Sequence, residues 1–116
     1  MSTRIATALL ALFFLAASLF AADLTGTWQA EVQTDAGNGS PTLKLQQNGE
    51  KITGTYSGAL GEAKVTGTVK GTEVTIEFDA QVHVVYQGKI ADDGKSMSGA
   101  VDLGGQATGT FKAVKQ

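Results

Sequence analysis

The segment Leu43–Tyr56 reads LKLQQNGEKITGTY and decides the fold class. Apolar and polar residues alternate on both sides of Asn48-Gly49, which is the period-two pattern of a strand with one buried face. An Asn-Gly pair tolerates the positive φ angles that a tight antiparallel turn requires. The segment therefore predicts a β-hairpin with one apolar face.

The same alternation runs outward from this hairpin, back to Leu24 and on to the C-terminus, with no helical stripe of apolar residues. We predict strands over residues 24–34, 41–48, 50–57, 62–70, 72–79, 81–90, 95–103 and 106–115. The connections are short and rich in Gly, Asp and Asn, so they leave almost no room for parallel crossovers. We expect an antiparallel up-and-down meander of eight strands.

A weak repeat indicates how the meander closes. The pattern Thr-Gly-Thr-apolar occurs at residues 25–28, 53–56, 66–69 and 108–111. By alternation each of these glycines lies on the apolar face of its strand, where it permits sharp bending and close approach of another backbone. Recurring mid-strand glycine favours a sheet that coils tightly enough to close into an all-β, eight-stranded antiparallel barrel. The alternative is an open two-sheet sandwich, which similar patterning also allows.

The N-terminal segment has the layout of a signal peptide. Arg4 precedes a 13-residue apolar run at 8–20, and the small pair Ala21-Ala22 follows it. A transmembrane anchor is the alternative, but a spanning helix needs about 20 apolar residues. We expect cleavage after Ala21 or Ala22. This divides the chain into a helical signal peptide at 1–22 and a secreted or periplasmic barrel domain at 23–116, with no membrane span after processing.

The composition excludes several kinds of site. The chain has no cysteine and 1 histidine, which removes disulfides, zinc–thiolate sites and multi-histidine metal sites. Its formal net charge of −2 provides no basic surface for nucleic acid. We expect no metal, no cofactor and no nucleic-acid partner, and a monomer.

Three features resemble the calycin-like barrels, the group that includes lipocalins and avidin-like proteins. They are Gly26-Thr27-Trp28 on the first strand, the eight-strand meander, and a basic residue near the end of the last strand. The stretch Leu43–Thr55 and the closing Gly109-Thr110-Phe111 are similar to small barrel domains of exported bacterial proteins. The resemblance covers nearly all of the chain after residue 22.

The resemblance also implies a structural role for three residues. In calycins a basic side chain from the last strand covers the first-strand tryptophan at the base of the barrel. Here that tryptophan is Trp28, and the nearest basic residues are Lys112 and Lys115.

The residues predicted to face inward carry no charge. They are Leu24, Trp28, Val32, Leu43, Leu45, Ile52, Tyr56, Val65, Val69, Val74, Ile76, Phe78, Val82, Val84, Tyr86, Ile90, Met97, Val101, Leu103 and Phe111. An eight-stranded barrel is either filled by its side chains or holds one small ligand, and both alternatives are open here. A ligand site would be lined by Trp28, Tyr56, Tyr86 and Phe111 around the mid-strand glycines Gly54 and Gly109. Such a site suits a small apolar ligand and lacks the polar groups that would orient biotin.

No catalytic constellation is present in the sequence. His83 falls on the outward register of its strand, whereas general acid–base chemistry needs a histidine in a cleft near a partner. The serines lack a nucleophile-elbow context. We expect a non-enzymatic binding or accessory module. The alternative is a small secreted enzyme or enzyme inhibitor that acts through loops at one mouth of the barrel.

Overall fold

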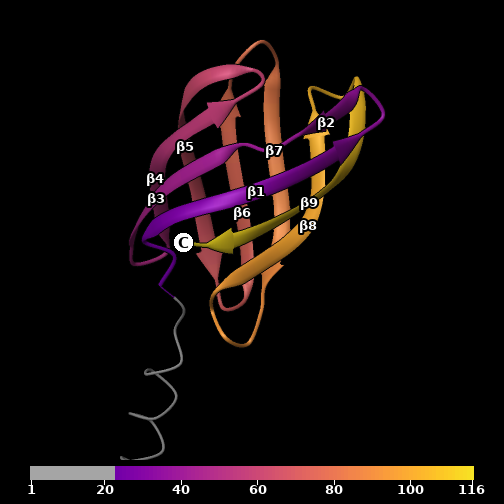
Figure 1. Ribbon diagram of the computed structural model, residues 1–116. Helices are drawn as coiled ribbons and strands as arrows, with labels where there is room; N and C mark the ends of the chain where they lie inside the picture. The colour runs from indigo at the N-terminus through magenta and orange to yellow at the C-terminus, as the bar shows by residue number, and fades with distance from the viewer. Residues whose placement is uncertain (1–22) are drawn as a thin grey trace, which may run out of the picture.

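The computed structural model describes residues 23–116, all of whose regular elements are β-strands (Figure 1). The predicted signal peptide at 1–22 lies outside the described residues. The strands are β1 (Gly26–Thr34), β2 (Gly37–Gly39), β3 (Thr42–Asn48), β4 (Lys51–Gly58), β5 (Gly61–Lys70), β6 (Glu73–Asp79), β7 (His83–Ile90), β8 (Ser96–Leu103) and β9 (Ala107–Lys115). Within the described part of the chain, no helix is long and apolar enough to cross a membrane.

The strands form a closed barrel. From β3 to β9 each strand pairs antiparallel with the next, β1 pairs with β3, and β1 also pairs with β9. The closing β1–β9 ladder runs from Trp28 opposite Lys115 to Thr34 opposite Gly109. This ladder leaves no gap between first and last strands, so the predicted eight-stranded up-and-down barrel is confirmed and the open sandwich is excluded.

One element differs from the sequence prediction. Residues 35–40 were expected to be a turn, but β2 folds back on the end of β1, with Thr34 opposite Gly37 and Val32 opposite Gly39. The Thr34 hydroxyl donates to the Gly37 carbonyl oxygen over 2.8 Å and accepts from the Ala36 N–H over 3.1 Å, which tightens the turn. Periodicity missed this strand because Gly-Asn-Gly carries no apolar residue to mark a face.

The core lies inside the barrel and is apolar. All residues predicted to face inward are buried, except Val32, Val82 and Leu103, which are partly buried. Three alanines outside the predicted set are also buried, namely Ala30, Ala107 and Ala113. No polar or charged residue is among the buried residues of the described chain. The Asn48-Gly49 turn is also as predicted, since Gly49 adopts a φ of 64°.

The mid-strand glycines let neighbouring backbones approach closely. A Cβ atom placed on Gly54 would overlap the carbonyl oxygen of Lys44, and one on Gly109 would overlap the carbonyl oxygen of Gln33. Both oxygens belong to the backbone of the adjacent strand and cannot swing aside. Glycine is therefore what allows the sheet to coil this sharply.

The alternation of strands gives the barrel two distinct ends. The turns at 35–36, 59–60, 80–82 and 104–106 meet at one end, which we call the upper end after its position in Figure 1. The turns at 49–50, 71–72 and 91–95 lie at the lower end, together with the start of β1 and the end of β9. These two ends differ in the side chains that they present.

Candidate functional site

The lower end is closed by the start of the described chain. Leu24 is fully buried, and its carbonyl oxygen accepts a hydrogen bond from the Trp28 indole Nε1 over 2.9 Å. The backbone N–H of Leu24 donates to Oε1 of Gln47 over 2.9 Å. The Lys115 ammonium donates to the Asp23 carbonyl oxygen over 3.2 Å. These bonds, from β1, β3 and β9, hold Leu24 across the base as a plug.

Of the two lysines expected near Trp28, the structure places Lys115 at the base. Lys115 is directly opposite Trp28 in the β1–β9 ladder, and its Cε lies 2.9 Å from where a Cβ on Gly26 would be. Lys112 is exposed on the outer face, opposite Glu31. The two differ because they are three positions apart on the strand, so their side chains point to opposite faces.

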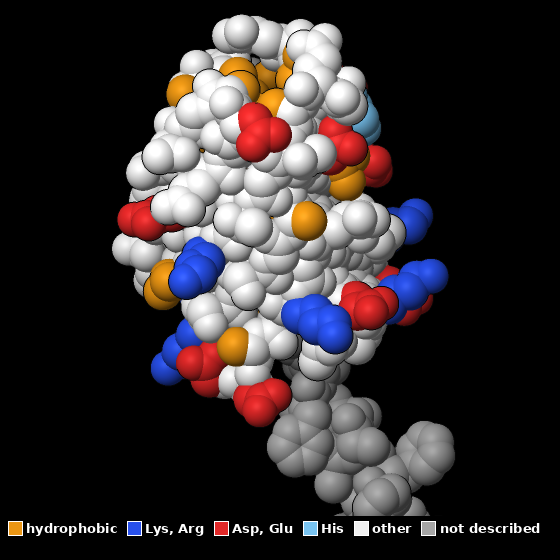
Figure 2. Space-filling model, turned by 90° about the vertical axis from the view of Figure 1, so that its right-hand side faces the viewer, with side chains coloured by type: hydrophobic (Ala, Val, Ile, Leu, Met, Phe, Trp, Pro, Cys, Tyr) orange, Lys and Arg blue, Asp and Glu red, His pale blue; other side chains and the backbone are white. Residues whose placement is uncertain are grey.

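The upper end presents apolar side chains instead of a plug. Figure 2 shows hydrophobic side chains gathered in a hollow at this end of the molecule. The partly buried hydrophobic residues that pack against the core are Val32, Leu60, Ala63, Ala80, Val82 and Leu103. They come from the ends of β1, β5 and β8 and from the β4–β5 and β6–β7 connections. We call this set the apolar mouth.

A row of four aromatic rings crosses the interior. Ring centroids are 4.2 Å apart for Tyr56 and Phe78, 5.7 Å for Phe78 and Tyr86, and 4.9 Å for Tyr86 and Phe111. The structure thus brings together Tyr56, Tyr86 and Phe111, as the sequence analysis proposed for a ligand site, and adds Phe78 to them. Trp28 is anchored separately, at the plug. Packed rings of this kind hold one another in fixed orientations.

Part of the space beside the glycines is filled. Gly88 and Gly99 lie opposite each other, and Phe111 lies opposite Gly99. The Phe111 ring carbon Cζ is 2.9 Å from where a Cβ on Gly88 would be. The ring therefore covers the glycine pair. Gly54 and Gly109, which were proposed to line a ligand site, cannot take a bulky residue, so filling the interior from these positions is not possible in a folded protein.

The hydroxyls of the two tyrosines differ in their bonding. The Tyr56 Oη accepts a long hydrogen bond of 3.4 Å from the Leu60 N–H at the upper end. The Tyr86 side chain is 3% exposed, and its hydroxyl has no hydrogen-bond partner among residues 23–116. No unpartnered side-chain oxygen in that range is sealed from solvent, so the Tyr86 hydroxyl still borders open space. Burial raises the pKa of Tyr86 above its ordinary value of 10.0, and Tyr56 contributes in the same direction.

His83 lies outside the barrel, as predicted, but it is not isolated. Its Nδ1 is 2.7 Å from the Asp79 carboxylate and its Nε2 is 3.5 Å from the Glu77 carboxylate. The hydrogen bond to Asp79 is the main cause of a raised His83 pKa. The imidazole is 52% exposed, so the group is open to water rather than in a cleft. Sequence reasoning missed the two carboxylates, although the short 80–82 connection places Asp79 opposite His83.

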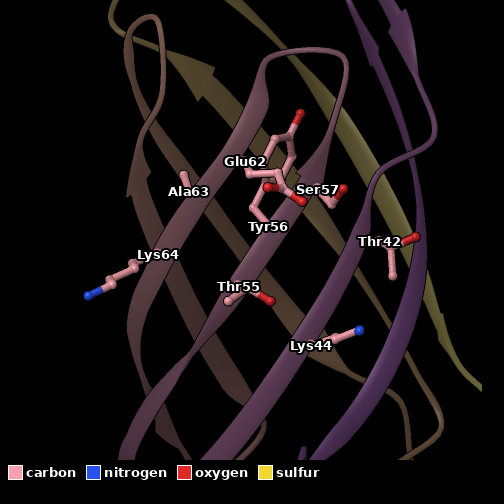
Figure 3. Close-up of a pocket in the computed structure, with 8 residues that line it drawn as sticks. All are labelled: Thr42, Lys44, Thr55, Tyr56, Ser57, Glu62, Ala63 and Lys64. Atoms are coloured by element: carbon pink, nitrogen blue, oxygen red, sulfur yellow. The ribbon is translucent and has the colours of Figure 1, made fainter.

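The outer face carries a shallow groove of about 620 Å³ over β3, β4 and β5 (Figure 3). It is lined by Thr42, Lys44, Thr55, Tyr56, Ser57, Glu62, Ala63 and Lys64. Figure 3 shows Lys44 and Lys64 extending in opposite directions from the sheet. Their charges do not converge on one point, so the groove has the character of a solvated outer face. Across residues 23–116, no group of three or more His, Asp or Glu side chains could hold a metal ion.

Comparison with known proteins supports the fold. No protein-family model matches the chain, and no curated protein matches it. Among solved structures, a redesigned β-barrel, mFAP0, bound to DFHBI is similar, with a TM-score of 0.58 and 19% sequence identity. The match covers 79% of this chain and 98% of that barrel. Likeness at this level of identity establishes the closed antiparallel barrel architecture.

Proposed function

We propose that this protein is an exported, non-enzymatic β-barrel that acts as a binding or accessory module and holds a small apolar ligand at its upper end. The contrast between the two ends carries the proposal. Leu24 plugs the lower end and is held by hydrogen bonds with Trp28 and Gln47, whereas the upper end offers an apolar mouth above packed aromatic rings. A ligand would enter from above and rest against the rings.

The chemistry of this end favours an apolar compound. Aliphatic side chains line the mouth, and the tyrosine hydroxyls are the polar groups of the aromatic row. Burying a polar group without a partner costs free energy, so biotin, nucleotides and sugars would lose more hydrogen bonds to water than they regain here. The related architecture of mFAP0, solved bound to DFHBI, supports the use of such a barrel as a binding scaffold.

Export rests on the sequence of residues 1–22, whose charged start, apolar run and small-residue end are typical of a signal peptide. We propose that cleavage releases the barrel into the periplasm or the medium. Mass spectrometry of the protein isolated from these compartments should find a chain that begins at Ala22 or Asp23. A mature protein that retains residues 1–22 would overturn this part of the proposal.

Binding is tested by a thermal-shift screen of apolar aromatics, fatty acids and small polar metabolites. A ligand specific for the native state raises stability by about 2.7 kcal/mol at a free concentration of about 100 times its dissociation constant. We expect shifts with apolar compounds only. The variant Ala80→Phe, which narrows the mouth, should lose them. Its matched control is Ala91→Phe, which places the same ring on an exposed residue at the lower end and should keep them. No shift across the panel would overturn the binding proposal.

A further inference from the structure

We propose that the ligand of the apolar mouth is an organic cation, that is, an apolar body that carries one ammonium group. This inference rests on the proposed function and specifies the ligand class of that same site. It is carried by the charges around the upper end and by an unpartnered hydroxyl inside it.

The charged residues of the upper end are all acidic. Asp35 lies in the β1–β2 turn, Glu62 is the second residue of β5, Asp79 ends β6, and Asp102 precedes the last residue of β8. All four are exposed, and the Asp79 side chain is 84% exposed. Figure 2 shows acidic side chains and the histidine near the apolar hollow, with the lysines farther down.

The four carboxylates form what we call the acidic rim of the upper end, and lysines are absent next to its turns. No Lys or Arg occurs within two residues of the turns at 35–36, 59–60, 80–82 and 104–106. By contrast, charges of both signs lie at the lower end and balance one another. Its lysines are Lys51, Lys70, Lys89, Lys95 and Lys115, and its carboxylates are Asp23, Glu50, Glu73, Asp92 and Asp93. The barrel is thus polarised along its axis, and its open mouth lies at the negative end. A field of this sign attracts cations and repels carboxylates.

The interior offers a second, independent feature. Tyr86 is 3% exposed, and its hydroxyl finds no hydrogen-bond partner within residues 23–116 while still bordering open space. Because the hydroxyl is not sealed from solvent, water can satisfy it in the free protein, and a guest that displaces this water must offer a hydrogen-bonding group in its place. The oxygen lone pairs of the hydroxyl can accept from an ammonium N–H.

The test compares three compounds that share one phenyl-alkyl skeleton, namely phenethylamine, phenethyl alcohol and hydrocinnamate. Their affinities for the mature protein are measured by calorimetry at mildly alkaline pH, where His83 is neutral and does not offset Asp79 and Glu77 but the ammonium group of phenethylamine is still protonated. We expect the ammonium compound to bind about tenfold more tightly than the carboxylate at low ionic strength, with the alcohol between them. High salt should reduce the differences in affinity between the three compounds, because the acidic groups are exposed and salt screens their charges.

Two sets of variants locate the effect. Neutralising all four carboxylates of the upper end with Asp35→Asn, Glu62→Gln, Asp79→Asn and Asp102→Asn should abolish the preference for the cation. The control, Glu50→Gln with Glu73→Gln at the lower end, should leave it intact. Tyr86→Phe should weaken the binding of the ammonium compound several-fold. The alcohol should still bind more tightly than the carboxylate. Circular dichroism should show that the variant barrel is folded.

The outcomes separate this inference from the proposed function. Equal binding of the three compounds, or tighter binding of the carboxylate, would overturn the inference and leave an apolar-ligand barrel. A cation preference that survives neutralisation of the rim would also overturn it. If none of the three compounds and none of the wider apolar panel binds, the proposed function fails and the inference fails with it.

Discussion

The indole Nε1 of Trp28 donates a hydrogen bond to the carbonyl oxygen of Leu24, 2.9 Å away, and both side chains are fully buried. The two residues are four positions apart, so the chain turns across the barrel base immediately before β1 begins. Trp28 therefore fills the core and also holds the residue that closes the lower end. Loss of the indole removes both contributions.

Trp28→Ala should destabilise the barrel by about 3–5 kcal/mol, because it deletes a large buried aromatic side chain and leaves a cavity. That is a large part of the roughly 5–15 kcal/mol by which such domains are stable. Urea unfolding followed by circular dichroism measures the loss. Trp28→Phe keeps much of the volume but leaves the Leu24 carbonyl without its donor, so a smaller loss is expected. A Trp28→Ala midpoint close to that of the unmodified protein would contradict this account.

Gly54→Ala should destabilise the barrel or prevent its folding, because the new Cβ would overlap the Lys44 carbonyl oxygen on the adjacent strand. The matched control is Gly39→Ala, since a Cβ on Gly39 meets no atom within 4 Å and its φ is not positive. Thermal melts of the two variants provide the comparison. Equal melting temperatures would show that the sheet coils without help from glycine.

His83 should titrate above 6.5, because its protonated form is stabilised mainly by the hydrogen bond to Asp79 and also by Glu77. The measurement is an NMR titration of the imidazole ring. In Asp79→Asn the pKa should fall toward 6.5, and in Glu77→Gln the fall should be smaller. A His83 pKa that is the same in all three proteins would contradict the ion pair.

The direction of this shift sets a pH dependence of stability. Because the folded-state pKa of His83 is raised, the stabilisation is complete below the unfolded pKa of about 6.5 and is lost as the pH rises through the folded pKa. Urea unfolding at pH values on both sides of this window should show the loss in the unmodified protein. Asp79→Asn should lose less stability over the same pH range. An equal change of unfolding free energy with pH in both proteins would contradict the role of the His83–Asp79 pair.

Tyr86 should make the protein sensitive to alkaline pH. Burial raises its folded-state pKa above 10.0, so the unfolded chain ionises first and stability falls as the pH rises past 10.0. Tyr86→Phe should unfold less readily under alkaline conditions. Near neutral pH it should cost little stability, because the hydroxyl that it removes has no partner among the described residues. Identical alkaline unfolding of the two proteins would show that Tyr86 ionises freely.

Much of the fold follows from local patterns. The alternation around Asn48-Gly49 predicted a hairpin, and the structure pairs Leu43 with Tyr56 across it. Inward residues were predicted well because a strand allows two side-chain directions and an apolar core selects one of them. β2 escaped prediction, since three residues without an apolar member carry no such signal. The aromatic residues of the candidate site were identified as inward for the same reason.

Other features of the protein were decided only by contacts between strands that are distant in sequence. Alternation puts Lys112 and Lys115 on opposite faces of one strand, but the β1–β9 register decides that Lys115 lies opposite Trp28. The same holds for the carboxylates beside His83 and for the spacing of Tyr86 and Phe111. Closing the barrel gathers alternate turns at one end, which is how an acidic rim and an apolar mouth come from residues that are far apart in sequence. Periodicity specifies the face of each residue, whereas neighbours across a curved sheet are set by register and coiling.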